Sequence, residues 1–214
     1  LFLAGSIGAS KPPPMSYIPA EVVERAIDEG SVVRALVEYN NRLVVSGSNG
    51  RIRFYNDDAT AVERTIDTGS LIYSLVVLND RLVTGHADQT IKIWNKDATA
   101  VETSIDTGSS IYSLVVLNDQ LVTGDLGGLM KFWNKDVTAV ERIIDMHYWI
   151  FVLVVLNDQL VTGHADRAIK FWNNDATAVE RMIHASARVG VRVSSLVACN
   201  GQLVSGDSDG RIKF

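Results

Sequence analysis

Residues suited to metal or acid–base chemistry recur at corresponding places along the chain. They are His86, Asp125, His164 and Asp207, with Ser48 at the same place nearer the N-terminus. Imidazole and carboxylate groups are suitable ligands for zinc. The ligands of one zinc ion must all lie within about 2.0–2.3 Å of it, and these residues come from separate, widely spaced segments. We therefore predict no metal site.

The same residue types could support nucleophilic catalysis, but the patterns that catalysis requires are missing. The sequence has no Gly-rich phosphate-binding loop between a strand and a helix, no nucleophile elbow and no pair of histidines at helical spacing. Ser, His and Asp occur in most chains, and a catalytic triad is defined by its geometry. We predict a protein that is not an enzyme, with no catalytic residues and no cofactor.

The elements that carry these residues are copies of one segment. Residues 72–80 read Ile-Tyr-Ser-Leu-Val-Val-Leu-Asn-Asp, and residues 111–119 repeat them without change. Residues 150–158 repeat them with an altered first half. A fixed period of this length is the signature of a repeat architecture. Large aromatic residues mark the same 39-residue spacing, at Tyr55, Trp94, Trp133 and Trp172.

Each unit predicts four short strands. In the second unit residues 72–78 form an apolar run of strand length, and the Asn-Asp pair that follows tolerates the positive φ angles of a two-residue hairpin. Residues 81–84, 90–94 and 100–105 supply the other strands, the last with one polar face. A single sheet of this size cannot bury both faces, whereas radial stacking around a channel buries them.

The unit resembles the WD40 repeat of the β-propeller family. The matching stretch is residues 84–95, with similar endings at 123–134 and 162–173 and looser ones at 46–56 and 205–214. The resemblance covers residues 21–214 and implies an all-β fold. We expect a propeller of about five four-stranded antiparallel blades, its ring closed by the N-terminal strand. The alternative is a fragment of a larger ring, for example one of seven blades.

The resemblance also implies a buried hydrogen-bond network in each blade, formed in the family by His, Ser or Thr, Asp and Trp. The usual Gly-His pair is replaced here by Gly-Ser, so Ser70, Ser109 or a water molecule is expected in place of the histidine. In the third unit Gly127 replaces the Asp. The remaining members of the network are Thr84, Asp88, Trp94, Thr123, Trp133, Thr162, Asp166 and Trp172.

The two ends of the repeat region complement each other. Residues 22–28 match the outer strand of later units, whereas the last unit reaches Phe214 before an outer strand of its own. We predict that residues 22–28 pair beside residues 211–214 and complete a propeller domain at residues 21–214. Residues 1–20 are predicted to be an N-terminal extension or a vestigial blade.

Composition restricts the function classes. The 214 residues carry a formal net charge of −5, which disfavours a general nucleic-acid or anionic-membrane surface. No apolar run approaches the about 20 residues of a transmembrane helix, so we expect no membrane insertion. The single cysteine, Cys199, cannot form an internal disulfide and fits a reducing compartment. We therefore expect an intracellular, cytoplasmic protein.

The loops of one propeller face differ between units, most sharply where Met146, His147, Tyr148 and Trp149 replace small polar residues. Leu126 lies in a neighbouring loop of the same blade. Large aromatic residues are typical anchors of protein interfaces, so we predict a partner-binding site here. The alternative is that the aromatics fill a locally widened core, with Trp149 the more buried of the two.

A second difference is the crossing at residues 184–193, which is longer than its counterparts. It carries Arg188 and Arg192, which could bind an acidic group of a partner. The alternative is a solvated loop insertion.

These observations favour a non-catalytic interaction scaffold that presents the loops of one face to a protein or peptide. As in many members of the family that it resembles, we expect the domain to be part of a larger complex or multidomain protein. The alternative is a propeller that binds a carbohydrate or small ligand. That alternative would be supported by the same loop residues in every blade, which the sequence does not show.

Overall fold

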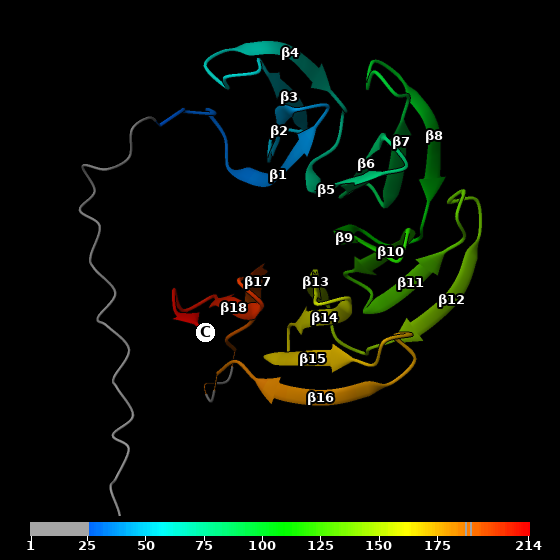
Figure 1. Ribbon diagram of the computed structural model, residues 1–214, viewed down its shortest axis with the longest axis vertical. Helices are drawn as coiled ribbons and strands as arrows, with labels where there is room; N and C mark the ends of the chain where they lie inside the picture. The colour runs from blue at the N-terminus through cyan, green and yellow to red at the C-terminus, as the bar shows by residue number, and fades with distance from the viewer. Residues whose placement is uncertain (1–25, 187, 189) are drawn as a thin grey trace, which may run out of the picture.

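The computed structural model describes residues 26–186, 188 and 190–214. Within these ranges the protein consists of β-strands, turns and loops, and it has no helix that is long and apolar enough to cross a membrane. Five antiparallel sheets stand around a common axis, each with its first strand nearest the centre (Figure 1). The predicted all-β propeller of five blades is therefore confirmed.

The first three sheets each contain four strands in sequence order. The first comprises β1 (Val33–Tyr39), β2 (Arg42–Gly47), β3 (Arg51–Tyr55) and β4 (Val62–Asp67). The second comprises β5 (Ile72–Leu78), β6 (Arg81–His86), β7 (Thr90–Trp94) and β8 (Val101–Asp106). The third comprises β9 (Ile111–Leu117), β10 (Gln120–Asp125), β11 (Leu129–Trp133) and β12 (Val140–Asp145).

The fourth sheet follows the same plan, and the fifth has three strands among the described residues. The fourth comprises β13 (Ile150–Leu156), β14 (Gln159–His164), β15 (Ala168–Trp172) and β16 (Val179–His184). The fifth comprises β17 (Val193–Cys199), β18 (Gln202–Asp207) and β19 (Ile212–Lys213).

Local sequence explains the turns. Asn79 and Asp80 join β5 to β6 with φ angles of 51° and 58°, the left-handed pair that a tight hairpin requires. In the outer turn the Asn95 side chain accepts hydrogen bonds from the backbone N–H groups of Thr99, at 2.7 Å, and Ala100, at 3.1 Å. The same Asn-centred turn recurs after β3, β11 and β15, which fixes the position of each outer strand.

The apolar core lies between the sheets, not within any one of them. Ile72, Leu75 and Trp94 of the second sheet pack with Val44 and Ile52 of the first. Three further clusters of the same kind join the second sheet to the third, the third to the fourth and the fourth to the fifth. Each intermediate sheet is therefore covered by its predecessor on one face and by its successor on the other.

Glycine makes this close stacking possible. A Cβ atom added at Gly85 would lie 2.6 Å from Cγ2 of Ile111 in the next sheet, and one at Gly124 would lie 2.6 Å from Cγ2 of Ile150. Hydrogen bonds reinforce the contact, since the backbone N–H of Leu114 donates to Oγ of Ser74 across the same interface at 3.0 Å. Any side chain at the glycine positions would push neighbouring sheets apart.

Within the described part of the chain, no sheet covers the two end faces of this series. Leu36 of β1 holds the place that Leu75 holds in β5, yet it is 62% exposed whereas Leu75 is 6% exposed. At the other end Ile212 of β19 is exposed, although its counterpart Ile91 is buried. In Figure 1 the first and last sheets stand apart. In the other neighbouring sheets the two inner strands pack against each other, and β1 and β17 lack this packing.

Ring closure by the N-terminal strand is not confirmed. Most of the predicted strand at residues 22–28 lies outside the described residues, and so does the predicted extension or vestigial blade at residues 1–20. The described part of that strand, Ala26, Ile27 and Asp28, is exposed and is not in a strand. Closure at β19, and the alternative of a fragment from a larger ring, both stay predictions.

We expect Leu75→Ala to lower the free energy of unfolding by about 2–5 kcal/mol, because it removes a buried side chain between two sheets. The matched variant Leu36→Ala should change it by less than about 0.5 kcal/mol, as at other exposed sites. Urea unfolding followed by tryptophan fluorescence measures both. If Leu36→Ala lowers the free energy of unfolding as much as Leu75→Ala does, another segment covers the first sheet in solution.

Candidate functional site

The residues considered as metal ligands do not converge. His86, Asp125, His164 and Asp207 each end the second strand of their own sheet. In the first sheet the corresponding residue is Gly47, which pairs with Val33 as His86 pairs with Ile72, so the assignment of Ser48 to this place was wrong by one residue. Among the described residues no group of three or more His, Cys, Asp or Glu side chains could hold a metal ion.

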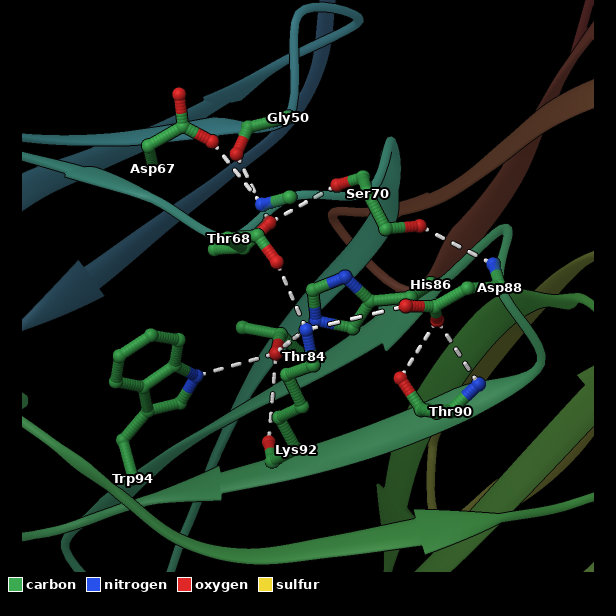
Figure 2. Close-up of polar contacts among 11 residues, drawn as sticks. Gly50, Asp67, Thr68, Ser70, Thr84, His86, Asp88, Thr90, Lys92 and Trp94 are labelled. Atoms are coloured by element: carbon green, nitrogen blue, oxygen red, sulfur yellow. Dashed lines mark hydrogen bonds and ion pairs between the residues drawn. The ribbon is translucent and has the colours of Figure 1, made fainter.

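His86 instead belongs to a buried hydrogen-bond network (Figure 2). The indole Nε1–H of Trp94 donates to Oγ1 of Thr84 at 3.1 Å, and Nε2 of His86 lies 2.7 Å from the same oxygen. The fourth sheet repeats this arrangement, with Nε1 of Trp172 3.2 Å and Nε2 of His164 2.7 Å from Oγ1 of Thr162. In the second and fourth sheets the place expected for Ser70 or water is thus taken by a histidine from the second strand.

The two aspartates assigned to the network have a different role. Oδ1 of Asp88 accepts hydrogen bonds from the backbone N–H of Thr90 at 3.2 Å and from its hydroxyl at 2.6 Å. Asp166 likewise accepts a hydrogen bond from the backbone N–H of Ala168, at 3.1 Å. Ser70 caps the same loop in the second sheet, since its Oγ accepts from the N–H of Asp88 at 3.1 Å (Figure 2). These carboxylates shape the loop between the second and third strands.

The third sheet shows a charged version of the network. Trp133 donates to Oγ1 of Thr123 at 3.2 Å, but Asp125 takes the place of the histidine. The buried Asp125 carboxylate lies 3.4 Å from Nζ of Lys131 and accepts from the backbone N–H of Leu129 at 2.8 Å. Burial of this carboxylate is tolerated because a cation and a backbone donor both face it.

Burial keeps the two network histidines neutral. The pKa of His86 is lowered from its usual 6.5 to about 4, first by burial and then by the positive charge of Lys92. The pKa of His164 is lowered to about 4 as well, by burial and by the charge of Lys170. A neutral imidazole can share a hydrogen bond with a Thr hydroxyl without a counter-ion. Both groups are therefore structural elements of their blades.

Residues predicted to bind a partner lie in different environments. Met146 is 6% exposed and packs in the core between the third and fourth sheets, so its assignment to a binding surface was wrong. Its backbone N–H donates to the carbonyl of Gly128 at 2.8 Å, which turns the side chain into that core. Leu126 is partly buried in the neighbouring loop.

The next three residues are exposed. Tyr148 is 51% exposed and Trp149 is 53% exposed. The prediction that Trp149 would be the more buried of the two was therefore wrong. His147 adopts a φ of 61° at a place where Gly69 and Gly108 have φ angles of 75° and 78° in other crossings. A non-glycine residue in this left-handed region is uncommon and costs backbone strain. The crossing therefore displays large side chains at some energetic cost.

The two arginines of the longer crossing are separated. Arg188 lies 3.5 Å from a carboxylate oxygen of Asp209 and is thus engaged within the fifth sheet. The guanidinium of Arg192 instead lies 5.1 Å from the ring centre of Phe151 on the inner strand of the fourth sheet. Trp149 contacts the same ring edge-on, with ring centres 6.1 Å apart. Arg192 and Trp149 therefore meet at Phe151.

Sequence reasoning missed the surface to which Phe151 belongs. Tyr73 and Tyr112 hold the same place on β5 and β9, and with Phe151 they line a hollow of about 370 Å³ to which residues of all five inner strands contribute. The three rings follow one another, Tyr73 stacking on Tyr112 at 4.3 Å and Tyr112 meeting Phe151 edge-on at 5.1 Å. The sequence signal that could have revealed this surface is the aromatic residue at the second position of three inner strands. Each of these residues lies within an otherwise apolar run, which made it look like part of the core.

We expect the stability of the protein to fall as the pH is lowered from about 6.5 towards 4. The unfolded chain gains protons on His86 and His164 in that range, whereas the folded protein does not. A double variant His86→Gln/His164→Gln should show a smaller fall between pH 6.5 and 5, measured as the urea midpoint. The exposed pair His147→Gln/His184→Gln is the control, in which two imidazoles outside the network are removed. Equal slopes in all three proteins would contradict the assignment.

One repeat and the overall fold have known counterparts. The family model described as WD domain, G-beta repeat matches residues 65–95. Among solved structures, the chain is similar to the WD40 β-propeller domain of Doa1, with 18% identity and a TM-score of 0.72. It is also similar to a chain of a mitotic checkpoint complex, with 19% identity and a TM-score of 0.71. No curated protein matches the chain.

A computationally designed protein, Ika8, shares the fold as well, with 23% identity and a TM-score of 0.67. The similarity covers 84% of this chain but 57% of Ika8, and 84% of this chain but 62% of the Doa1 domain. For the checkpoint-complex chain the shares are 85% and 60%. The chain thus spans less than two thirds of each of these structures. It contains a WD40 repeat and has the fold of a WD40-repeat β-propeller.

Proposed function

We propose that this protein is a non-catalytic scaffold that binds a protein or peptide partner on the face carrying the crossings between its blades. WD40 propeller domains generally mediate protein–protein interaction, and the fold supports this class of function. The observation that carries the proposal is the pair of half-exposed aromatics, Tyr148 and Trp149, on a strained crossing. Exposed aromatics that rest on a rigid support are the usual anchors of an interface.

The surroundings of the pair suit this role. Trp149 leans against Phe151, and Arg192 lies over the same ring, so apolar area and positive charge adjoin. His147 directly precedes the pair in sequence, and Leu126 lies in a neighbouring loop of the same blade. Trp, Tyr and Arg are the residue types enriched among binding hot spots. Met146 supports this surface from the core beneath it.

A carbohydrate-binding propeller is the less favoured candidate. Sugar rings are commonly bound against free aromatic faces, and the Tyr73 and Tyr112 rings cover each other at 4.3 Å. The chain offers no equivalent platform on β1 or β17, where Arg34 and Ser194 occupy the same place. In this proposal the protein and its partner belong to a larger complex in the cytoplasm. We propose neither nucleic-acid binding nor membrane insertion for this chain.

Affinity capture with quantitative mass spectrometry tests the proposal. The double variant Tyr148→Ala/Trp149→Ala should recover a specific partner at least about tenfold less than the unmodified chain, because loss of a hot-spot residue costs about 2 kcal/mol or more. A matched variant, Ile143→Ala/Met182→Ala, removes two equally exposed apolar side chains from outer strands and should capture the partner normally. An unchanged partner list in the first variant would assign the aromatics to local packing and refute the proposed site.

A further inference from the structure

A continuous line of aromatic and guanidinium groups crosses the central hollow. Along the inner strands of the first four sheets the second residue is Arg34, Tyr73, Tyr112 and Phe151 in turn. The guanidinium of Arg34 lies 5.8 Å from the ring centre of Tyr73, and Tyr73 stacks on Tyr112 at 4.3 Å. The line continues through Phe151, and Arg192 closes it at 5.1 Å from that ring. Each end of the aromatic series therefore carries one arginine.

The two arginines have no carboxylate partner among the described residues. Neither Arg34 nor Arg192 forms an ion pair within residues 26–186, 188 and 190–214, although Arg188 close by is paired with Asp209. Both guanidinium groups are exposed at the hollow. Their cation–π contacts use the flat face of the group and leave N–H donors at its edge for an acceptor.

The charge of the hollow is opposite to that of the whole protein. The chain carries a formal net charge of −5, yet none of the described residues that line the hollow is Asp or Glu. The remaining lining residues are serines, among them Ser74, Ser113 and Ser195, and uncharged aliphatic residues. A concave, positively charged site in an acidic protein attracts an anion and repels cationic ligands.

We propose that this hollow binds an acidic peptide segment, with carboxylates held by Arg34 and Arg192 and apolar side chains laid along the half-buried rings of Tyr73 and Tyr112, which the buried ring of Phe151 supports. The arginines bind carboxylates through paired N–H donors. The edges of the rings and the serine hydroxyls between them accommodate the peptide backbone and side chains. This inference deepens the proposed function and rests on it, since it names the partner chemistry and extends the surface of Tyr148 and Trp149 into the centre of the propeller.

The rings between the two arginines favour a peptide over a small anion. Three successive rings separate Arg34 from Arg192 along the inner strands, and one phosphate or carboxylate ion would leave the half-buried rings of Tyr73 and Tyr112 without a contact. An extended chain of several residues presents acidic and apolar side chains at regular intervals and can contact both kinds of group. Phosphorylated residues offer the same anionic chemistry as Asp and Glu, and the test below separates the two.

Selection from a display library of random 12-residue peptides tests the inference on the full chain. Enrichment of Asp and Glu around apolar residues is expected, with binding that weakens as salt is raised. The best peptide is then measured by fluorescence polarisation against Arg34→Ala and Arg192→Ala. Each variant should weaken binding about tenfold or more, because a charge-assisted hydrogen bond is lost. Arg34→Lys and Arg192→Lys should be intermediate, since lysine keeps the charge without the planar fork.

Arg142→Ala is the matched control, because Arg142 also lies over an aromatic ring, at 3.8 Å from the centre of Phe132, but on an outer strand. It should bind the peptide normally. The inference is overturned if no acidic peptide is enriched, or if the arginine variants bind as tightly as the unmodified chain. Displacement of the peptide by inorganic phosphate at equal concentration, or strong binding only of a phosphoserine version, would likewise refute a carboxylate site.

These outcomes are distinct from a failure of the proposed function. If the Tyr148→Ala/Trp149→Ala variant loses a captured partner while Arg34→Ala and Arg192→Ala retain it, the scaffold function stands and the acidic-peptide site does not. If no variant changes the captured proteins, both fail together.

Discussion

Everything in this protein depends on how closely one sheet approaches the next. Gly85, Gly124 and Gly163 stand where the inner strand of the following sheet comes nearest, and a Cβ atom at any of them would overlap a branched side chain. The branched residues themselves, such as Ile111 and Ile150, are fully buried. Since no sheet has a core of its own, this spacing sets the shape of the whole molecule and the width of the hollow at its centre.

The same spacing determines which side chains meet in the hollow. Tyr73 and Tyr112 can stack because their strands belong to adjacent sheets held at a fixed distance, and Phe151 follows one sheet later. Residues that are far apart in the chain thereby form one surface, to which the crossing before β13 adds Trp149. The repeated framework supplies the geometry, and the few positions at which the copies differ supply the chemistry.

The fold was predictable because its signals are periodic and local. Asn79 and Asp80 define a hairpin by themselves, and the regular spacing of Trp94, Trp133 and Trp172 defines the blades. The involvement of His86 was also within reach, since Thr84 and His86 are two residues apart and so point to the same face of a strand.

Other features of the site were not predictable. The pair Ser46-Gly47 resembles Thr84-Gly85, which shifted the alignment of the first unit by one residue, and only the strand pairing resolves the shift. The burial of Met146 beside the exposed Tyr148 depends on the backbone path of the crossing, which the amino-acid types alone do not determine. Among residues 26–186, 188 and 190–214, the sheet faces at Leu36 and Ile212 have no neighbouring sheet, which has a last consequence. A series of sheets that touch only their neighbours behaves as a one-dimensional array, so cooperative unfolding should begin at its two ends and spread inward blade by blade.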